Sequence, residues 1–521
     1  MTACIGIDIG TSGTKALVID PQGQILATDS ASYPCQHPQP LWSEQDPNDW
    51  WKATVRVVRS VIKQAKLKPA EVAAIGLSGQ MHGSVFLDQQ ERVLRPAILW
   101  NDQRTVAECA EIESRAGGRR RLIKMVANPA LTGFTAPKIL WLRNQEPRVF
   151  ERVAKVLLPK DEIRRRLTGE FATDVSDASG TLLLDVVHRR WSKRLMSKLE
   201  LDSDLLPPCY ESDEITGKLS KAAAKTLGLT TSCSVVAGAG DCAAGAIGSG
   251  IVRRGLLSTS IGTSGVVFVH SDLPQFDPQG RLHTFCHAVP GKWHMMGVTL
   301  AAGGALDWFR SALYPQSNEG RSNTHKGKSR RKQQDPISFD RLIAEAAKTP
   351  TGAEGLQFLP YLAGERTPHL DPRARGSLVG LTLSHTRGHI VRAILEGVTY
   401  TLRDSLTIIE ELGIPVRQIR TTGGGAKNPF WRQLQADIFG KRVTAMAADE
   451  GPALGVALLA AVGVGHFKSI NEACQATVQL ADLSKPVLKA RRYHDCAFPL
   501  FQQFYRATRK EMHALGELVD R

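Results

Sequence analysis

The pentapeptide IGTSG occupies residues 9–13 of this 521-residue chain and returns unchanged at residues 261–265. Each copy follows an apolar run, ACIGID or GLLSTS, and leads into another, KALVID or VVFVH. A turn rich in Gly, Thr and Ser between two strands directs backbone N–H groups and hydroxyls toward one point, which suits phosphate oxygens. One such turn is an ordinary hairpin connection. Two identical turns, one in each half of the chain, predict a duplicated fold with two phosphate loops facing across a cleft.

An aspartate lies between these two loops in the stretch VVAGAGDCAAGAIGSG, residues 235–250. The apolar residues up to Val236 predict a buried strand, and the small residues that follow allow a tight turn into a Gly/Ala-rich helix. Asp241 opens that helix among small neighbours, so a substrate can approach its carboxylate closely. The structural alternative is a helix N-cap, a position that aspartate favours.

A third glycine loop, at residues 423–426, joins the two phosphate loops, and Asp8 precedes the first of them. Together these features resemble the sugar-kinase/actin/heat-shock-protein superfamily. Within it, GFTAPKILWLRNQ (133–145) and GSLVGLTLSHTRGHIVRAILE (376–396) resemble the two signatures of the FGGY carbohydrate kinases. More narrowly, four segments look like the bacterial xylulokinases of that family: LWSEQDP (41–47), SGQMHG (78–83), RPAILWND (95–102) and LPYLAGERTPH (359–369). The resemblance covers nearly the whole chain except a patch after about residue 314.

The resemblance implies a two-domain α/β fold of the ribonuclease H-like type, with mixed sheets, flanking helices and an interdomain cleft. Its length agrees, because 521 residues are too many for one core. We expect an N-terminal domain over residues 1–250, with the sugar site, the first phosphate loop and the base. A C-terminal domain over residues 251–521 would hold the second phosphate loop and the adenosine site. Residues 315–336 contain six Lys or Arg and no apolar period, so we expect a disordered basic insert there.

Composition excludes several other classes of protein. Apolar residues make up 42% of the chain, enough for large cores, and no apolar run is long enough to cross a bilayer. The chain opens on a strand-like run, which leaves no room for a signal peptide. Nine cysteines without a CxxC pair indicate neither a disulfide framework nor a zinc site and favour the cytoplasm. The net charge of +15 comes without a nucleic-acid motif and would help to capture anionic substrates. We expect neither a membrane nor a nucleic acid as partner.

Two aspartates are the catalytic candidates. In the family that this chain resembles, the aspartate at Asp241 accepts the proton of the sugar hydroxyl. The aspartate at Asp8 helps to hold the Mg²⁺ of MgATP, usually through water, which agrees with the reluctance of Mg²⁺ to lose its water. A structural turn aspartate is the alternative for Asp8.

The sugar site is expected just past the strand VAAIGLSG, since open α/β sheets bind ligands at strand ends. Gln80, Met81 and His82 follow that strand, and in xylulokinases the Met-His pair binds the sugar. Trp100, in WNDQR, supplies an aromatic face beside hydrogen-bonding groups, as sugars require, although a turn with a buried Trp anchor remains the alternative. Cys242 replaces the Asn that usually follows the catalytic aspartate in bacterial xylulokinases, so a thiol lies where an amide would reach the sugar hydroxyls.

The nucleotide is expected on the three glycine loops. For Lys15, contact with a phosphate and a solvated surface position are equally open. Asn428 can cap the helix after the third loop, and Pro429 suits its first turn. The residues assigned to ATP are Thr11, Ser12, Gly13, Lys15, Gly262, Thr263, Gly424, Gly425 and Asn428.

The implied activity is phosphoryl transfer from ATP, with Mg²⁺, to D-xylulose at O5, feeding xylose catabolism and the pentose phosphate pathway. One alternative is another FGGY kinase acting on ribulose, a related keto sugar, a polyol or gluconate. An alternative of another class is a non-catalytic nucleotide-dependent switch, against which Asp241, SGQMHG and both FGGY signatures argue. The small-molecule sugar and ATP are the expected partners, and the sequence leaves a homodimer open.

Overall fold

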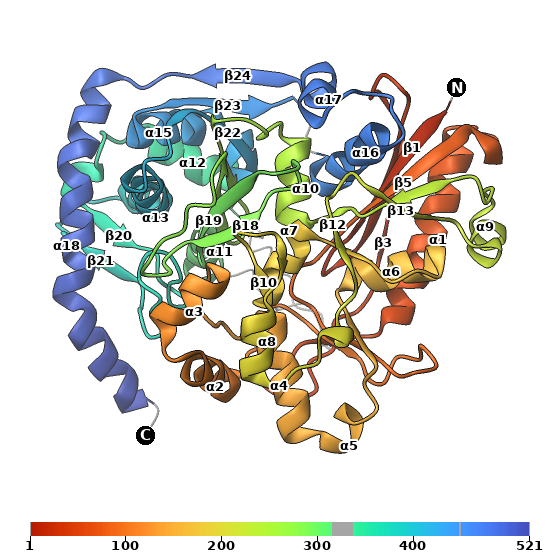
Figure 1. The fold of residues 1–521 in the computed structure, drawn as a ribbon. Coiled ribbons are helices and arrows are strands. Elements are labelled where there is room, and N and C mark those ends of the chain that lie inside the picture. The colour runs from red at the N-terminus through yellow and green to blue at the C-terminus, as the bar shows by residue number, and fades with distance from the viewer. Residues whose placement is uncertain (1, 315–336, 448–449, 520–521) are drawn as a thin grey trace, which may run out of the picture. The chain divides into compact units, whose positions relative to one another are not determined.

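The computed structural model describes residues 2–314, 337–447 and 450–519, and the insert predicted at 315–336 lies outside them (Figure 1). By its residue contacts, the chain divides into two compact units. The first comprises Met1–Leu256, Phe268–Met295 and Ala448–Gln479, and the second comprises Leu257–Val267, Met296–Ala447 and Leu480–Arg521. The single boundary after residue 250 stays a prediction.

A seven-stranded mixed sheet forms the centre of the first unit. Its order is β13-β14-β5-β1-β2-β3, and β15 also pairs with β5. β1 is antiparallel to β2 and parallel to β5, which is in turn parallel to β14 and β15. The bounds are β1 Ala3–Ile9, β2 Gly13–Ile19, β3 Ile25–Ser32, β5 Val72–Gly79, β13 Ile215–Lys218, β14 Ser234–Val236 and β15 Ala239–Gly240. The runs ACIGID, KALVID and QILATDS predict three strands before residue 33, which are confirmed as β1, β2 and β3, and the strand VAAIGLSG is confirmed as β5.

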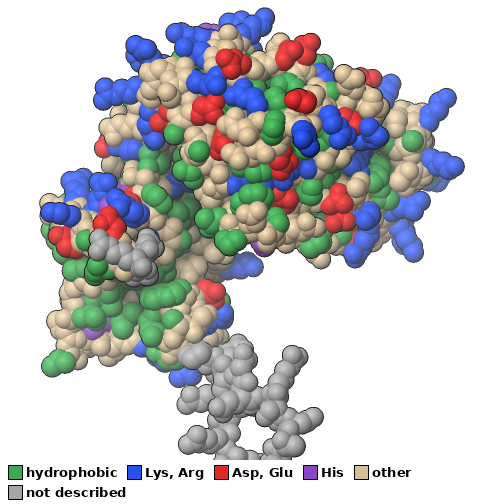
Figure 2. All heavy atoms as spheres, turned by 90° about the horizontal axis from the view of Figure 1, so that it is seen from below, with side chains coloured by type: hydrophobic (Ala, Val, Ile, Leu, Met, Phe, Trp, Pro, Cys, Tyr) green, Lys and Arg blue, Asp and Glu red, His purple; other side chains and the backbone are tan. Residues whose placement is uncertain are grey.

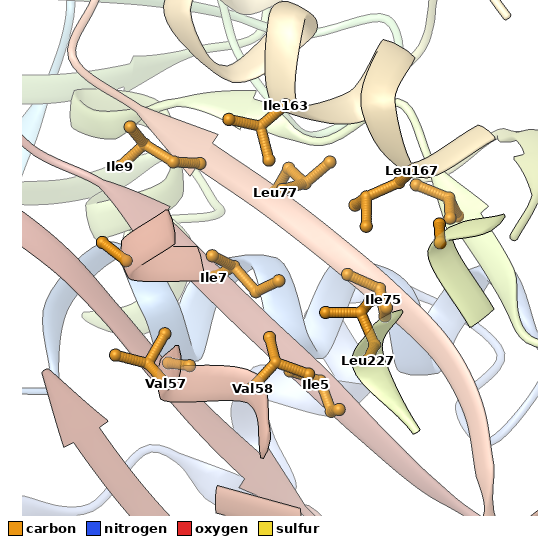
Figure 3. Close-up of a cluster of buried hydrophobic side chains, with 14 of the residues drawn as sticks. Ile5, Ile7, Ile9, Val57, Val58, Ile75, Leu77, Ile163, Leu167 and Leu227 are labelled. Carbon is orange, nitrogen blue, oxygen red and sulfur yellow. The ribbon is translucent and has the colours of Figure 1, made fainter. Parts of the chain in front are cut away.

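One face of this sheet packs on α1 (Pro47–Gln64), α6 (Pro159–Thr168) and α9 (Lys221–Leu227). Alternate residues of β1, namely Ile5, Ile7 and Ile9, point to this side and are fully buried, as the period of a strand requires (Figure 3). Asp46 followed by Pro47 predicts a capped helix start, and the structure confirms it for α1, because the Asp46 side chain accepts from the Asn48 N–H at 2.9 Å.

The other face of the sheet is covered by α10 (Asp241–Gly248) and α16 (Gly451–Gly463). Glycines permit a very close approach here. A Cβ on Gly6 of β1 would lie 1.9 Å from the Ala453 carbonyl oxygen, and one on Gly76 of β5 would lie 2.0 Å from that of Val456. Backbone therefore packs on backbone where α16 crosses the two central strands.

A second seven-stranded sheet has the order β18-β19-β17-β16-β22-β23-β24. In the second unit, residues 418–440 predict a strand, a glycine loop and a helix, which are confirmed as β22, α14 and α15. Ile390, Ile394 and Val398 recur at helical spacing and predict a helix from about His389, which is α13. The strand bounds are β16 Gly255–Ile261, β17 Gly265–Ser271, β18 His283–Cys286, β19 Trp293–Thr299, β22 Val416–Gly423, β23 Arg442–Met446 and β24 Leu480–Ser484. The main helices are α11 Gly303–Leu313, α12 Phe339–Ala347, α13 Arg387–Glu411, α14 Gly424–Lys427, α15 Pro429–Phe439 and α18 Leu488–Val519.

The positive charges do not gather into one patch on the face drawn in Figure 2. On the face drawn in Figure 2, Lys and Arg side chains are interspersed with acidic and apolar ones. All nine cysteines are free thiols. Among the described residues, no helix combines the length and the apolarity that crossing a bilayer needs.

One prediction about charged residues is wrong. Three consecutive arginines at residues 164–166 predict a solvated face, but Arg164 is fully buried. Its guanidinium donates to the Thr216 hydroxyl at 2.8 Å and to the Glu170 carbonyl at 2.8 Å. A buried cation needs such partners. Thr216 lies 52 residues further along the chain, so local sequence does not reveal this contact.

Candidate active site

The two catalytic candidates lie at the ends of β1 and β15, two strands of the first unit that both pair with β5. In the sheet register, Ser78 of β5 lies between Asp8 of β1 and Ala239 of β15. Asp241 follows β15 directly and is the first residue of α10. The N-cap position belongs to Gly240, so the N-cap alternative for Asp241 is wrong. The fold thus brings Asp8 and Asp241 to the same edge of the sheet, where strand ends bind ligands.

Burial is the main cause of an unusual pKa at both carboxyls. It raises the pKa of Asp241 to about 6, against which the hydrogen bonds from Cys242 act. The pKa of Asp8 rises to about 7 through burial first and then through the negative charge of Asp241. A carboxylate with a pKa near 6 is ionised at neutral pH and is a stronger base than an ordinary aspartate, as proton abstraction requires.

Asp8 also has the chemistry that a Mg²⁺ ion needs. Its Oδ1 is buried and has no hydrogen-bond partner, which leaves a hard oxygen ligand unsatisfied. Among the described residues, no three His, Cys, Asp or Glu gather as a metal site. A Mg²⁺ bound together with phosphates usually keeps several waters and takes only one or two protein carboxylates, and its binding by Asp8 stays a prediction. Lys15, the β2 neighbour of Asp8, forms an ion pair with Glu450 at 2.6 Å, and its contact with phosphate stays a prediction.

The first glycine loop closes a tight turn between β1 and β2. The Gly10 N–H donates to the Gly13 carbonyl at 3.0 Å. Within the loop, the Thr11 hydroxyl donates to Gln80 Oε1 at 3.1 Å and accepts from Trp100 Nε1 at 2.9 Å. The loop assigned to phosphate is therefore bonded to two residues assigned to the sugar.

The segment after β5 carries the other predicted sugar residues. Met81 is almost fully buried and lies against Gly240, where a Cβ would come within 2.9 Å of Met81 Cγ. His82 adopts a left-handed φ of 69°, which is uncommon for a residue with a side chain. Its Nδ1 lies 2.7 Å from the Gly180 carbonyl oxygen, and its ring centre lies 4.8 Å from that of Phe134. Tertiary contacts thus hold His82 in an unfavourable backbone conformation at the end of β5.

Lys138 holds the backbone at His82 through a hydrogen bond, a role that the sequence did not predict. Its Nζ donates to the His82 carbonyl at 2.8 Å and to the Gly133 carbonyl at 2.7 Å. Burial lowers the pKa of Lys138 to about 7. Lys138 lies within GFTAPK, at the start of the segment 133–145 that resembles an FGGY signature. No other feature of the sequence marks this lysine.

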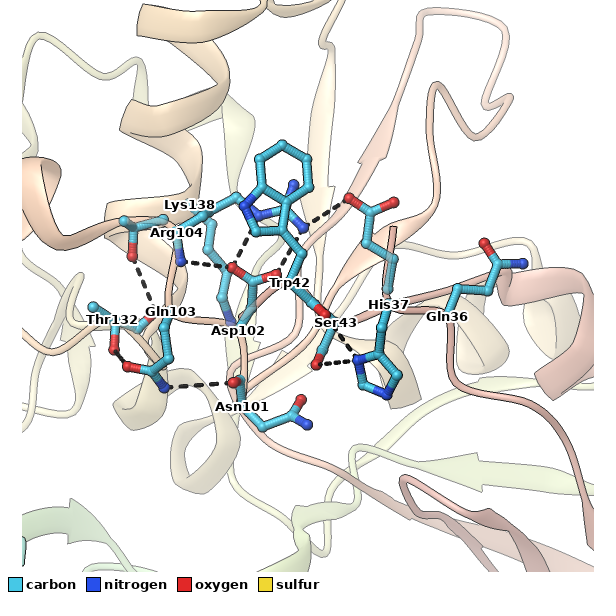
Figure 4. Close-up of polar contacts among 12 residues, drawn as sticks. Gln36, His37, Trp42, Ser43, Asn101, Asp102, Gln103, Arg104, Thr132 and Lys138 are labelled. Carbon is cyan, nitrogen blue, oxygen red and sulfur yellow. Dashed lines mark hydrogen bonds and ion pairs between the residues drawn. The ribbon is translucent and has the colours of Figure 1, made fainter. Parts of the chain in front are cut away.

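Trp100 is 40% exposed, so the alternative of a buried anchor is wrong. Figure 4 shows the rest of WNDQR and its partners. Asp102 is fully buried and accepts from Arg104 Nε at 2.9 Å, from Arg104 Nη2 at 2.7 Å and from the Ser43 N–H at 2.7 Å. The Arg104 guanidinium also stacks 3.5 Å from the centre of the Trp42 ring. Asp102 and Arg104 satisfy each other, so they brace the turn, whereas Trp100 remains accessible.

Cys242 is half-buried beside the base. Its N–H donates to Asp241 Oδ1 at 2.7 Å, and its side chain packs against an apolar group that includes Ala246 and Phe268. Burial raises the pKa of the thiol well above its usual value, so the group is neutral. Its contact with the sugar stays a prediction.

The second unit contains a cavity of about 540 Å³. Five of the residues assigned to ATP line it: Gly262, Thr263, Gly424, Gly425 and Asn428. Asn428 also caps α15, because its Oδ1 accepts from the N–H groups of Phe430 and Trp431 at 3.0 and 3.3 Å. Residues of the second and third loops thus line one cavity, and its occupation by a nucleotide stays a prediction.

Other residues of this cavity were not predicted. They include the apolar side chains of Phe339, Ile343 and Trp431 and the charged side chains of Asp307, Asp340 and Lys427. Flat apolar walls suit a base, while carboxylates and an ammonium suit ribose hydroxyls and phosphates. No local pattern marks these residues, because they come from α11, α12, α14 and α15 and meet only in the folded chain.

Comparison with known proteins gives two family matches. The model for the N-terminal domain of the FGGY family of carbohydrate kinases matches residues 3–248, and that for its C-terminal domain matches residues 257–464. A xylulose kinase of Escherichia coli K12 is 44% identical over 469 residues, which are 90% of this chain and 91% of that one.

Two solved structures from Lactobacillus acidophilus are also similar. A ligand-bound xylulose kinase aligns with a TM-score of 0.89 at 27% identity, covering 98% of each chain. A gluconate kinase aligns with a TM-score of 0.88 at 28% identity, covering 97% of this chain and 98% of that one. Since the two scores are nearly equal, the fold does not distinguish between these two sugars.

Proposed function

This chain belongs to the FGGY family of carbohydrate kinases, and from that premise we propose that it phosphorylates D-xylulose with ATP. The observation that carries the proposal is the placement of Asp241 at the same sheet edge as Gln80, Met81 and His82. The relative from Escherichia coli, at 44% identity, supports D-xylulose as the sugar.

Asp241 acts as the general base. It takes the proton from O5 of the sugar as that oxygen attacks the γ-phosphorus of ATP, and the bond from phosphorus to the β-γ bridging oxygen breaks to release ADP. Such transfers depend mainly on positioning and on stabilisation of charge. Asp8 would hold Mg²⁺, which, when bound with ATP, neutralises charge on the phosphate oxygens. The raised pKa of Asp241 makes its carboxylate a better proton acceptor near neutral pH.

The sugar lies against Trp100 and the Gln80–His82 segment. The exposed indole of Trp100 offers an apolar face to the carbon chain, and the His82 ring offers a polar group to its hydroxyls. Gln80 is buried and acts on this site through its bonds to Thr11 and Gln45. Cys242 faces the same substrate through a weakly hydrogen-bonding thiol.

ATP takes the cavity of the second unit for its nucleoside and the glycine loops for its phosphates. The part of this site in the cavity is lined by Gly262, Thr263, Gly424, Gly425 and Asn428. In the first loop, Thr11, Ser12 and Gly13 present backbone and hydroxyl groups to phosphate oxygens, and Lys15 can add a positive charge.

A second candidate is kinase activity toward gluconate or another sugar of the family. The observation that favours it is the nearly equal structural likeness to the gluconate kinase, together with a thiol at Cys242. Steady-state ADP release with D-xylulose, D-ribulose, D-gluconate and glycerol separates the candidates. We expect kcat/KM for D-xylulose to exceed the others by at least tenfold. A higher value for any other member would replace the substrate, and release of ADP without dependence on sugar would reject the kinase.

A further inference from the structure

The first unit buries a lysine among three carboxylates, outside the residues assigned to substrate. Lys160 Nζ lies 2.5 Å from Asp161 Oδ1, 2.9 Å from Asp174 Oδ1 and 3.6 Å from Asp177 Oδ2. All four side chains have no exposed area. Buried ion pairs contribute little to stability, because desolvation offsets their attraction. Such a cluster is better explained by the geometry that it imposes on its neighbours.

A chain of hydrogen bonds leads from this cluster to the residue before Asp241. Asp174 Oδ2 accepts from the Ser176 hydroxyl at 2.5 Å and from the Ser212 hydroxyl at 3.1 Å. Ser176 Oγ in turn accepts from the Gly240 N–H at 3.1 Å. A hydroxyl has a single proton, and since Asp174 takes it, only lone pairs of Ser176 remain for Gly240. The lysine and the carboxylate therefore fix which way the Ser176 hydroxyl faces.

Gly240 is the N-cap of α10, and Asp241 is the next residue. Gly240 has no side chain that could accept a hydrogen bond from the first N–H groups of α10. The Ser176 hydroxyl, which belongs to another segment, instead binds the backbone at the start of this helix. The same segment contacts the sugar side. Four residues beyond Ser176, the Gly180 carbonyl lies 2.7 Å from His82 Nδ1. One short segment, α7 (Val175–Ala178) and the turn after it, thus contacts both the backbone before the base and a residue assigned to sugar.

We propose that Ser176, oriented by Asp174 and Lys160, is a positioning residue that holds Asp241 at the distance required to take the proton from the sugar. This inference rests on the proposed function, since it assigns Asp241 as the base. It predicts that removing the acceptor at Ser176 slows the chemical step and leaves sugar binding nearly intact.

The test compares Ser176→Ala with Ser212→Ala. Ser212 is an equally buried serine that donates to the same Asp174 oxygen, but the structure gives its hydroxyl no bond to Gly240. Ser176→Cys is the second variant, because it retains nearly the same shape while sulfur is a weak acceptor. For each variant we measure kcat and KM for D-xylulose, KM for ATP and the thermal midpoint.

We expect kcat to fall at least tenfold in Ser176→Ala and Ser176→Cys, because a displacement of about 1 Å can cost about 10²-fold in rate. KM for D-xylulose should remain within about threefold, and Ser212→Ala should retain kcat within about twofold. If Ser176→Ala does not fold, Ser176→Cys decides. Equal kcat in the Ser176 and Ser212 variants would overturn the inference, as would a loss confined to KM.

The same experiment separates this inference from the proposed function. If the unmodified protein phosphorylates another sugar in place of D-xylulose, the substrate assignment fails and the serine variants are compared on that sugar. If it phosphorylates no sugar, the base assignment fails and the role of Ser176 fails with it.

Discussion

Replacing Asp241 by Asn should stabilise the protein while it abolishes catalysis. Asp241 is held in a buried position where its ionised form is unfavourable, and burial raises its pKa from 3.8 to about 6. An amide has the same shape, carries no charge and can still accept the Cys242 N–H through its oxygen. The substitution therefore removes an electrostatic cost and the proton acceptor together.

The magnitude follows from the pKa difference. A rise of about two units, at about 1.4 kcal/mol each, means that ionised Asp241 costs about 3 kcal/mol of folding free energy well above pH 6. Because folding favours the protonated form, this cost shrinks as pH falls from 6 to 4 and is absent below the unfolded pKa. The charge of Asp241 also raises the pKa of Asp8, so its removal relieves part of the cost at Asp8.

Thermal unfolding from pH 5 to pH 8 provides the assay, alongside steady-state kinetics. We expect Asp241→Asn to raise the midpoint by several degrees at pH 8, with a gain that shrinks toward pH 5. We expect kcat to fall about 10²–10⁴-fold, the usual worth of a general base. A destabilised variant at pH 8, a gain independent of pH, or a kcat near that of the unmodified protein would refute this reasoning.

Three further predictions follow from the site. Below about pH 6, kcat/KM for D-xylulose should fall tenfold per pH unit as Asp241 is protonated, and a profile flat to pH 4.5 would exclude it as the base. Cys242→Asn should lower KM for D-xylulose about threefold to tenfold, because one neutral hydrogen bond contributes about that much affinity. Steady-state kinetics should show an unchanged KM for ATP. A raised KM for D-xylulose would count against that substrate. Asn428→Ala should raise KM for ATP and lower stability by about 1 kcal/mol through loss of the α15 cap, measured by kinetics and denaturant unfolding, and unchanged values of both would remove Asn428 from the site.

Features determined by short-range pattern could be read from the sequence. The strand Val72–Gly79 agrees in both bounds with the apolar run that predicted it. Asp46 and Asn428 cap their helices as expected, because a cap depends only on the two or three residues that follow it.

The helical face of α1 shows where such patterns become inaccurate. The helical spacing of Trp51, Val55, Val58 and Ile62 in the sequence predicts a buried stripe, yet Trp51 and Val55 are only partly buried. Trp50, by contrast, is fully buried and donates from Nε1 to Gln45 at 3.0 Å. The buried stripe therefore lies about one residue earlier than predicted. The indole of Trp50 can be buried because its N–H has a polar partner in the core. Hydrophobic spacing alone does not reveal such a hydrogen bond.

Charged residues were the least predictable part of the site. Lys160 meets Asp174 and Asp177 only after α6 and α7 pack together, and Asp102 is neutralised by Arg104 through a side-chain geometry that the letters WNDQR do not specify. Each of these pairings decides whether a charge faces the substrate or braces the fold, and each depends on tertiary contacts.

The most direct test of phosphoryl transfer to D-xylulose is identification of the phosphorylated carbon. The protein is incubated with ATP, Mg²⁺ and D-xylulose labelled with ¹³C at C5, and the product is analysed by ¹³C and ³¹P NMR. The account predicts one phosphorylated sugar per ADP released, with coupling between ³¹P and the labelled C5. A phosphate on any other carbon, or ADP released with free phosphate in place of a sugar phosphate, would contradict it.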